Sequence, residues 1–102
     1  MIFALICKDK PGSLDVRLAN RPAHLDYLAS LNGAERLKFA GPLLGDDGKP
    51  IGSLLAVEAQ DRQAAEALAA DDPYARAGLF DSVEIHPWNW VFNAPGEKVE
   101  TR

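Results

Sequence analysis

Three side chains that could bind and activate an anionic molecule lie in one short segment: Arg17, Arg21 and His24. On a continuous helix, the seven residues from first to last make almost two turns, so the three share a face about 10 Å long. Two guanidinium groups would suit a carboxylate or phenolate. A histidine side chain, with an ordinary pKa of about 6.5, suits a general acid or base. The segment therefore predicts acid–base chemistry on a small anion.

A general base needs a neighbouring carboxylate that fixes the tautomer of its imidazole, and Asp72 is the candidate. Each of these residues also has a plainer interpretation. A lone helical histidine is more often structural than catalytic, and the two arginines could form a solvated face that pairs with Asp15 and Asp26. Asp72 before Pro73 is a common pair at the end of a helix. The functional interpretation depends on a fold that brings the residues together.

Apolar periodicity and turn residues predict the order strand, helix, strand, strand, helix, strand. Pro22 either kinks the first helix or starts a second one. The expected strands are at 1–7, 36–40, 51–59 and 82–92. The first helix is expected at 13–32, capped by Ser13 and stopped by Gly33, with an apolar stripe of Leu14, Leu18, Leu25, Leu28 and Leu31. The second is expected at 62–70, capped by Asp61, with a further turn of helix at 74–79. Residues 1–92 form one domain, and 93–102 form a polar tail.

This order fits an α+β fold, the ferredoxin-like βαββαβ plait, with both helices on one face of an antiparallel four-stranded sheet. The start of the first helix then lies beside the end of the second, which places His24 near Asp72. The first and third strands are apolar on both faces, so the second face of the sheet needs a cover. For so short a chain the simplest cover is a second copy, which predicts a homodimer through the sheet face.

Composition narrows the possible partners. The 102 residues carry a net charge of −4 and the pI is near 5.0, which makes nucleic-acid binding the least favoured of the possible functions. Because Cys7 is the single cysteine, an internal disulfide is excluded, and Cys7 is expected to be a buried thiol. One cysteine and two histidines are too few for a Cys/His zinc cluster, so no metal site is expected. The opening apolar run is too short to span a membrane and lacks the features of an export signal, so the expected compartment is the cytoplasm.

Other candidates are weaker. Ser53 lies on a strand among apolar residues, and its hydroxyl could face a cleft; Tyr74 is either a cleft wall or a core contact. Trp88 and Trp90 are two residues apart and share a face, where they line a ligand cleft or fill the dimer interface, the interface being favoured. His86 is expected to pack against the last strand.

The chain resembles the YciI (YCII-related) family of small bacterial proteins. The resemblance rests on an apolar first strand ending in Lys-Asp and on the segments RLANRPAHLDYL (17–28), AGPLL (40–44), GSLLAVEAQD (52–61) and DDPYARAGLFDSVEIHPW (71–88). It implies a ferredoxin-like dimeric α/β-barrel and a His–Asp pair that maps onto His24 and Asp72. It also implies, for some members, elimination of chloride from a hydroxylated aromatic ring without a cofactor.

These observations lead to three hypotheses. In the first, the chain is a cofactor-independent enzyme of the lyase or isomerase type, in which Asp72 orients His24, Arg17 neutralises the substrate and Tyr74 with a tryptophan holds its ring. In the second, the same cleft is a non-catalytic, dimeric binding module for a small metabolite. In the third, the protein is a structural or interaction partner whose cleft is shallow.

Overall fold

The structure is a computed structural model that describes residues 1–95. Its elements, in chain order, are β1 (Ile2–Asp9), α1 (Leu14–Gly33), β2 (Leu37–Leu44), β3 (Pro50–Glu58), α2 (Arg62–Asp71), α3 (Pro73–Arg76) and β4 (Phe80–Trp88). The four strands form one antiparallel sheet in the order β2-β3-β1-β4. The predicted α+β class and the order of the elements are therefore confirmed. Most of the predicted tail, from residue 96 onward, lies outside the described residues.

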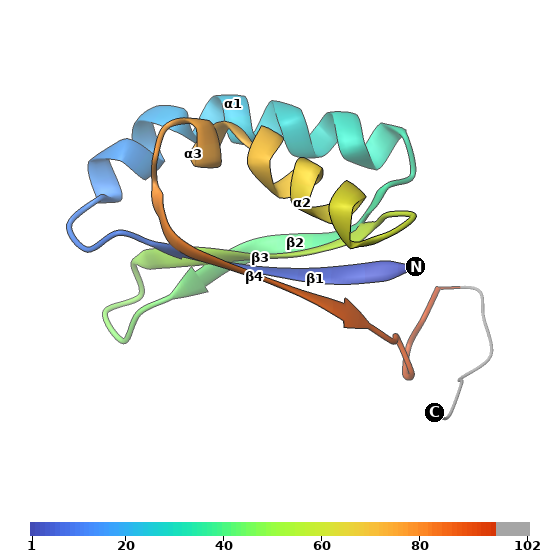
Figure 1. Ribbon diagram of the computed structural model, residues 1–102. Coiled ribbons are helices and arrows are strands. Elements are labelled where there is room, and N and C mark those ends of the chain that lie inside the picture. The colour runs from blue at the N-terminus through green and yellow to red at the C-terminus, as the bar shows by residue number, and fades with distance from the viewer. Residues whose placement is uncertain (96–102) are drawn as a thin grey trace.

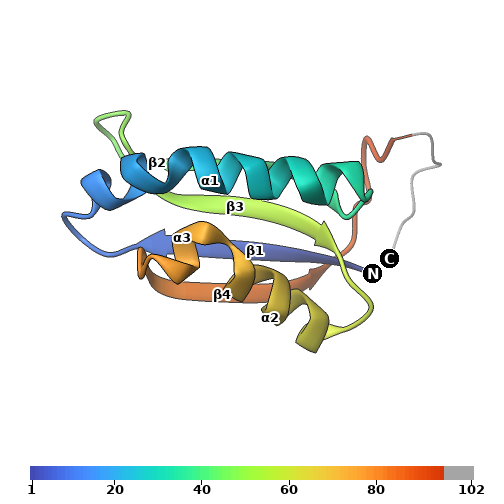
Figure 2. The same cartoon turned by 90° about the horizontal axis from the view of Figure 1, so that it is seen from above.

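All three helices lie on the same side of the sheet (Figure 1). Seen from above, α1 runs along β2 and β3, whereas α2 lies beside β4 (Figure 2). Between helices and sheet is the core, to which β1 contributes Phe3, Leu5 and Cys7. Desolvation in this core, and secondly the charge of Asp72, raise the pKa of the Cys7 thiol to about 12. None of the helices within residues 1–95 is long and apolar enough to cross a membrane.

Helix α1 buries a different face from the one that its leucines predict. Its buried residues are Arg17, His24 and Leu31, which are spaced seven apart, whereas Leu18 and Leu25 are exposed. The predicted leucine stripe is therefore wrong for Leu18 and Leu25, whereas Leu31 belongs to the core and Leu28 packs against it. The helix is continuous through Pro22, so no second helix starts there. Ser13 precedes α1, but its side chain forms no capping hydrogen bond.

Among the strand boundaries that differ from expectation, the largest differences are at the ends of β4 and β2. The last strand ends at Trp88, not at residue 92; Trp88 pairs with Ile2, the first residue of β1. Strand β2 continues through Gly41 and Pro42, which were expected to end it. It is an edge strand, where a proline is tolerated because one side of the strand needs no hydrogen-bond donors.

Helices α2 and α3 are separated by a single residue, Asp72, which caps α3 by accepting a hydrogen bond from the backbone N–H of Tyr74 at 2.9 Å. Asp61 caps α2 in the same way, through the N–H of Ala64. The Tyr27 hydroxyl donates to the carbonyl of Leu68 at 2.7 Å and so ties α1 to α2. These contacts fix the α2–α3 junction against α1.

The face of the sheet away from the helices carries an aromatic cluster of Phe39, Trp88 and Trp90. The Phe39 ring meets both tryptophans edge-on, with centroids 5.5 and 5.4 Å away. Phe39 and Trp88 remain more than a third exposed. His86 is also exposed on this face, 3.3 Å from Glu84, so the expectation that it packs against the strand is wrong. An apolar face of this kind is the feature that a partner would cover.

Candidate active site

His24 and Asp72, which are 48 residues apart in the sequence, form a buried pair. Their Nδ1 and Oδ1 atoms are 2.8 Å apart, and the two residues are 7% and 2% exposed. The same Asp72 oxygen accepts the N–H of Tyr74, so the carboxylate is held by the start of α3. The predicted proximity of His24 and Asp72 is present in the structure. Its cause is the position of the α2–α3 junction against the middle of α1.

This geometry defines what the imidazole can do. Because Asp72 is a hydrogen-bond acceptor when ionised, Nδ1 of His24 carries the proton and donates it, which leaves a lone pair on Nε2. Within residues 1–95, Nε2 has no hydrogen-bond partner, and it is not among the fully buried polar atoms. His24 also lines a cavity. A carboxylate-oriented imidazole with a free, accessible Nε2 is the arrangement of a general base.

Tyr74 connects this pair to Arg17. Its ring stacks on the His24 imidazole, with centroids 3.9 Å apart and planes 17° from parallel. The Arg17 guanidinium lies over the same ring, 4.5 Å from its centroid. Tyr74 is 1% exposed, so it is part of the core and also part of the cavity wall. Burial raises the pKa of its hydroxyl, and the charges of Arg17 and Arg21 oppose that shift.

Arg17 is held by two partners from the sheet. Its Nε and Nη2 donate to the two carboxylate oxygens of Asp9 at 2.6 and 2.8 Å, and Nη2 also donates to the Ser53 hydroxyl at 2.9 Å. Burial opposes the charged form, but the hydrogen bond and the charge of Asp9 prevail and raise the pKa of Arg17 above its ordinary value. The alternative of a solvated pair with Asp15 or Asp26 is therefore wrong for Arg17.

Asp9 is a site residue that its sequence context does not reveal. It follows Lys8 and precedes Lys10-Pro11-Gly12, a segment typical of a turn. Its carboxylate is buried, with 7% of the side chain exposed. The available signal is its position at the end of β1, the strand at the centre of the sheet, where an acidic side chain needs a partner.

The cavity beside His24 has a volume of about 320 Å³, at the lower end of the range of about 300–1,000 Å³ for ligand pockets. One wall consists of Leu18, Leu25 and Leu28 of α1. Strand β2 contributes only small or compact residues opposite them, namely Ala40, Gly41 and Pro42. Because no long side chain of β2 fills the space under α1, a hollow remains that could admit a single ring.

Five of the seven site residues predicted from the sequence line this cavity: Arg17, Arg21, His24, Ser53 and Tyr74. Asp72, the sixth, does not line it but is hydrogen-bonded to His24. Arg21 lies one helical turn beyond Arg17 and is exposed. The seventh residue, Trp88, is not brought to the site. It pairs with Ile2 on the far face of the sheet and contacts Phe39 and Trp90 instead.

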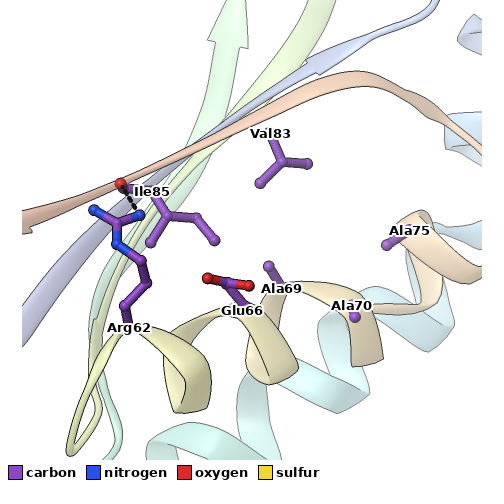
Figure 3. A pocket seen from close by; sticks show the side chains of 7 residues that line it. All are labelled: Arg62, Glu66, Ala69, Ala70, Ala75, Val83 and Ile85. Atoms are coloured by element: carbon purple, nitrogen blue, oxygen red, sulfur yellow. Dashed lines mark hydrogen bonds between the residues drawn. The ribbon is translucent and has the colours of Figure 1, made fainter.

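A second hollow, of about 410 Å³, lies between α2 and β4 (Figure 3). Its apolar lining consists of three alanines, Ala69, Ala70 and Ala75, with Val83 and Ile85 from the strand. Arg62 and Glu66 are its charged residues, and Arg62 donates a hydrogen bond to the carbonyl of Ile85 at 2.8 Å. It offers no buried acid–base pair, unlike the cavity at His24. The part of the chain that the structure describes holds no group of three or more histidine, cysteine or acidic side chains that could bind a metal.

The fold and the site define a small α+β protein with a buried histidine–carboxylate pair beside a cavity. The YCII-related domain family matches residues 1–89, and the chain belongs to this family. It is 37% identical over 98 residues to Protein YciI of Escherichia coli O6:H1, a match that spans 90% of this chain and all of that protein. The family resemblance drawn from the sequence is thus confirmed.

Solved structures of other proteins have a similar fold. The 5-chloro-2-hydroxyhydroquinone dehydrochlorinase TftG of Burkholderia phenoliruptrix AC1100, in complex with 2,5-dihydroxybenzoquinone, is 37% identical, with a TM-score of 0.79 over 87% of this chain and 94% of that chain. Protein Atu4242 of Agrobacterium tumefaciens is 14% identical, with a TM-score of 0.52 over 93% and 98% of the two chains, and shares the fold alone.

Proposed function

We propose that this protein is a cofactor-independent enzyme in which His24, oriented by Asp72, transfers protons on a small, hydroxylated and ionisable aromatic ring. The observation that carries the proposal is the 2.8 Å contact between Nδ1 and Asp72, which leaves Nε2 free beside the cavity. The similarity to a dehydrochlorinase supports an aromatic substrate that bears chlorine.

The chemistry requires no group beyond these side chains. Nε2 of His24 accepts a hydroxyl proton while the electron pair of that oxygen moves into the ring, and the carbon that bears chlorine is protonated. Loss of a second hydroxyl proton then expels chloride, so the overall change is loss of HCl. The ring is oxidised from a hydroquinone to a quinone as its carbon–chlorine bond is reduced, and the electrons balance within the substrate. His24 serves as base and then as acid.

The direct test is chloride release from 5-chloro-2-hydroxyhydroquinone by the purified protein, followed with a chloride electrode and by quinone absorbance. Turnover above the buffer rate is expected. Saturable binding of this compound without chloride release would contradict the enzyme and favour the binding module. Failure to bind it, with no stabilisation in a thermal-shift assay, would remove the proposed substrate class.

We also propose that two copies pair through the sheet face that the helices leave open. The support is the apolar character of this face, where Ile6 of the central strand and the aromatic cluster of Phe39, Trp88 and Trp90 are incompletely covered. Light scattering after gel filtration should give twice the mass of the 11.1 kDa chain. Ile6→Lys should give the monomer mass, because the new charge would be buried between the sheets.

Val16→Lys is the matched control for this variant. Val16 is an aliphatic residue that is exposed, but it lies on α1, on the helix side of the sheet. It should leave the dimer intact. A monomeric wild-type protein at micromolar concentration, or a dimer that survives Ile6→Lys, would contradict pairing through this face.

A further inference from the structure

We propose that Arg21, rather than Arg17, supplies the positive charge by which the cavity selects an anionic ring. The charge of Arg17 is neutralised by its ion pair with Asp9 and so contributes little to this selection. This inference rests on the proposed function, because it specifies which ionic form of the ring the same cavity accepts. It reverses the role that the sequence suggested for Arg17.

The charge of Arg17 is already balanced. Both oxygens of the buried Asp9 carboxylate accept its N–H groups, at 2.6 and 2.8 Å, and Ser53 takes a further one. Paired ions of this kind act together as a neutral group with little net field. Nη1 takes no part in the hydrogen bonds to Asp9 and Ser53, so Arg17 can still donate a hydrogen bond to a ligand. It can do so without adding net charge to the cavity.

Arg21 has the opposite character. It lines the same cavity one turn further along α1, and its guanidinium forms no ion pair with any carboxylate of the described chain. Arg21 is thus the cation of this cavity that keeps both its charge and its donors for a ligand.

The sum of the charges makes Arg21 decisive. Two cations, Arg17 and Arg21, face two anions, Asp9 and Asp72, when His24 is neutral. The site as a whole then has no net charge. Without Arg21, one negative charge remains, and an ionised ring would be repelled. The protonated imidazole that forms during turnover adds a positive charge only after the bound ring has given a further hydroxyl proton to His24.

The test compares two probes with the same ring. 2,5-Dihydroxybenzoquinone ionises at neutral pH, whereas its dimethyl ether, 2,5-dimethoxybenzoquinone, cannot. Titration calorimetry on the wild-type protein should give a lower dissociation constant for the ionised probe. Arg21→Gln should weaken binding of that probe by about tenfold, which is typical for the loss of a hydrogen bond to a charged group. It should leave the affinity for the dimethyl ether unchanged.

Two further variants separate the charge at the site from the shape of the side chain, and a third serves as a control. Arg21→Lys keeps the charge and should retain most of the preference. Asp9→Asn frees the charge of Arg17 while still offering it an oxygen, so it should strengthen binding of the ionised probe and should restore this binding when combined with Arg21→Gln. Arg36→Gln removes the same charge from an exposed arginine outside the cavity and should have no effect.

The outcomes distinguish this inference from the proposed function, because chloride release is measured separately. An unchanged preference for the ionised probe in Arg21→Gln, or equal binding of both probes by the wild-type protein, would overturn the role of Arg21 and leave the acid–base chemistry standing. Loss of the preference in a protein that releases no chloride would support Arg21 and overturn the enzyme. A wild-type protein that binds neither probe would overturn both.

Discussion

His24→Asn is expected to lower kcat for chloride release by about 10²–10⁴-fold, the contribution typical of a general acid or base. Asparagine is the informative substitution because its amide nitrogen can take the place of Nδ1 and donate to Asp72. The variant therefore keeps the contact that holds the α2–α3 junction against α1 and loses the proton-transferring Nε2. KM should change much less than kcat, because the leucine wall and Arg21 still bind the ring.

His86→Asn is the matched control. It removes the other histidine, which lies outside the cavity, beside Glu84 on the sheet face proposed for pairing, and it should retain wild-type kcat and the mass of the wild-type assembly. Steady-state kinetics and thermal melting of both variants separate a chemical role from a structural one. Full activity in His24→Asn would contradict the proposed mechanism. A folded, inactive variant that still binds the ring is the result that supports it.

Most of the fold could be predicted from local patterns in the sequence. The central position of β1 is readable because its residues are apolar on both faces, and the positions of α1 and α2 follow from periodicity and flanking turn residues. The pairing of His24 with Asp72 could be inferred because the topology places the end of α2 alongside α1. Each of these features depends on short segments or on connectivity.

The buried face of α1 could not be read in this way. Arg17 and His24 occupy positions that a hydrophobic pattern assigns to solvent. Their burial is tolerated because carboxylates of other elements, Asp9 and Asp72, form hydrogen bonds with them. Such partners are distant in the sequence. The leucines are displaced to the rim of the cavity for the same reason, which is why Leu18 is 56% exposed. A departure from local pattern thus marks the site.

The second large effect concerns Asp72. Asp72→Asn should lower kcat by about 10²-fold or more, since a full charge close to the imidazolium that forms during proton transfer is worth up to about 4 kcal/mol at an effective dielectric constant of 20. The single oxygen that accepts from both His24 and Tyr74 can be supplied by the asparagine amide. The hydrogen bonds and the cap of α3 are then kept, and the negative charge alone is lost.

Asp71→Asn is the control that the chain itself provides. Asp71 is adjacent and acidic, but it is exposed and pairs with Arg76 on the surface, so kcat and the melting temperature should remain those of the wild type. Asp72→Ala should also lose the cap of α3, about 1 kcal/mol, and melt about 4–8 °C lower. If Asp72→Asn kept wild-type kcat while Asp72→Ala melted early, Asp72 would hold the fold together without assisting His24. A large fall in kcat at an unchanged melting temperature in Asp72→Asn requires that its charge acts on the reaction.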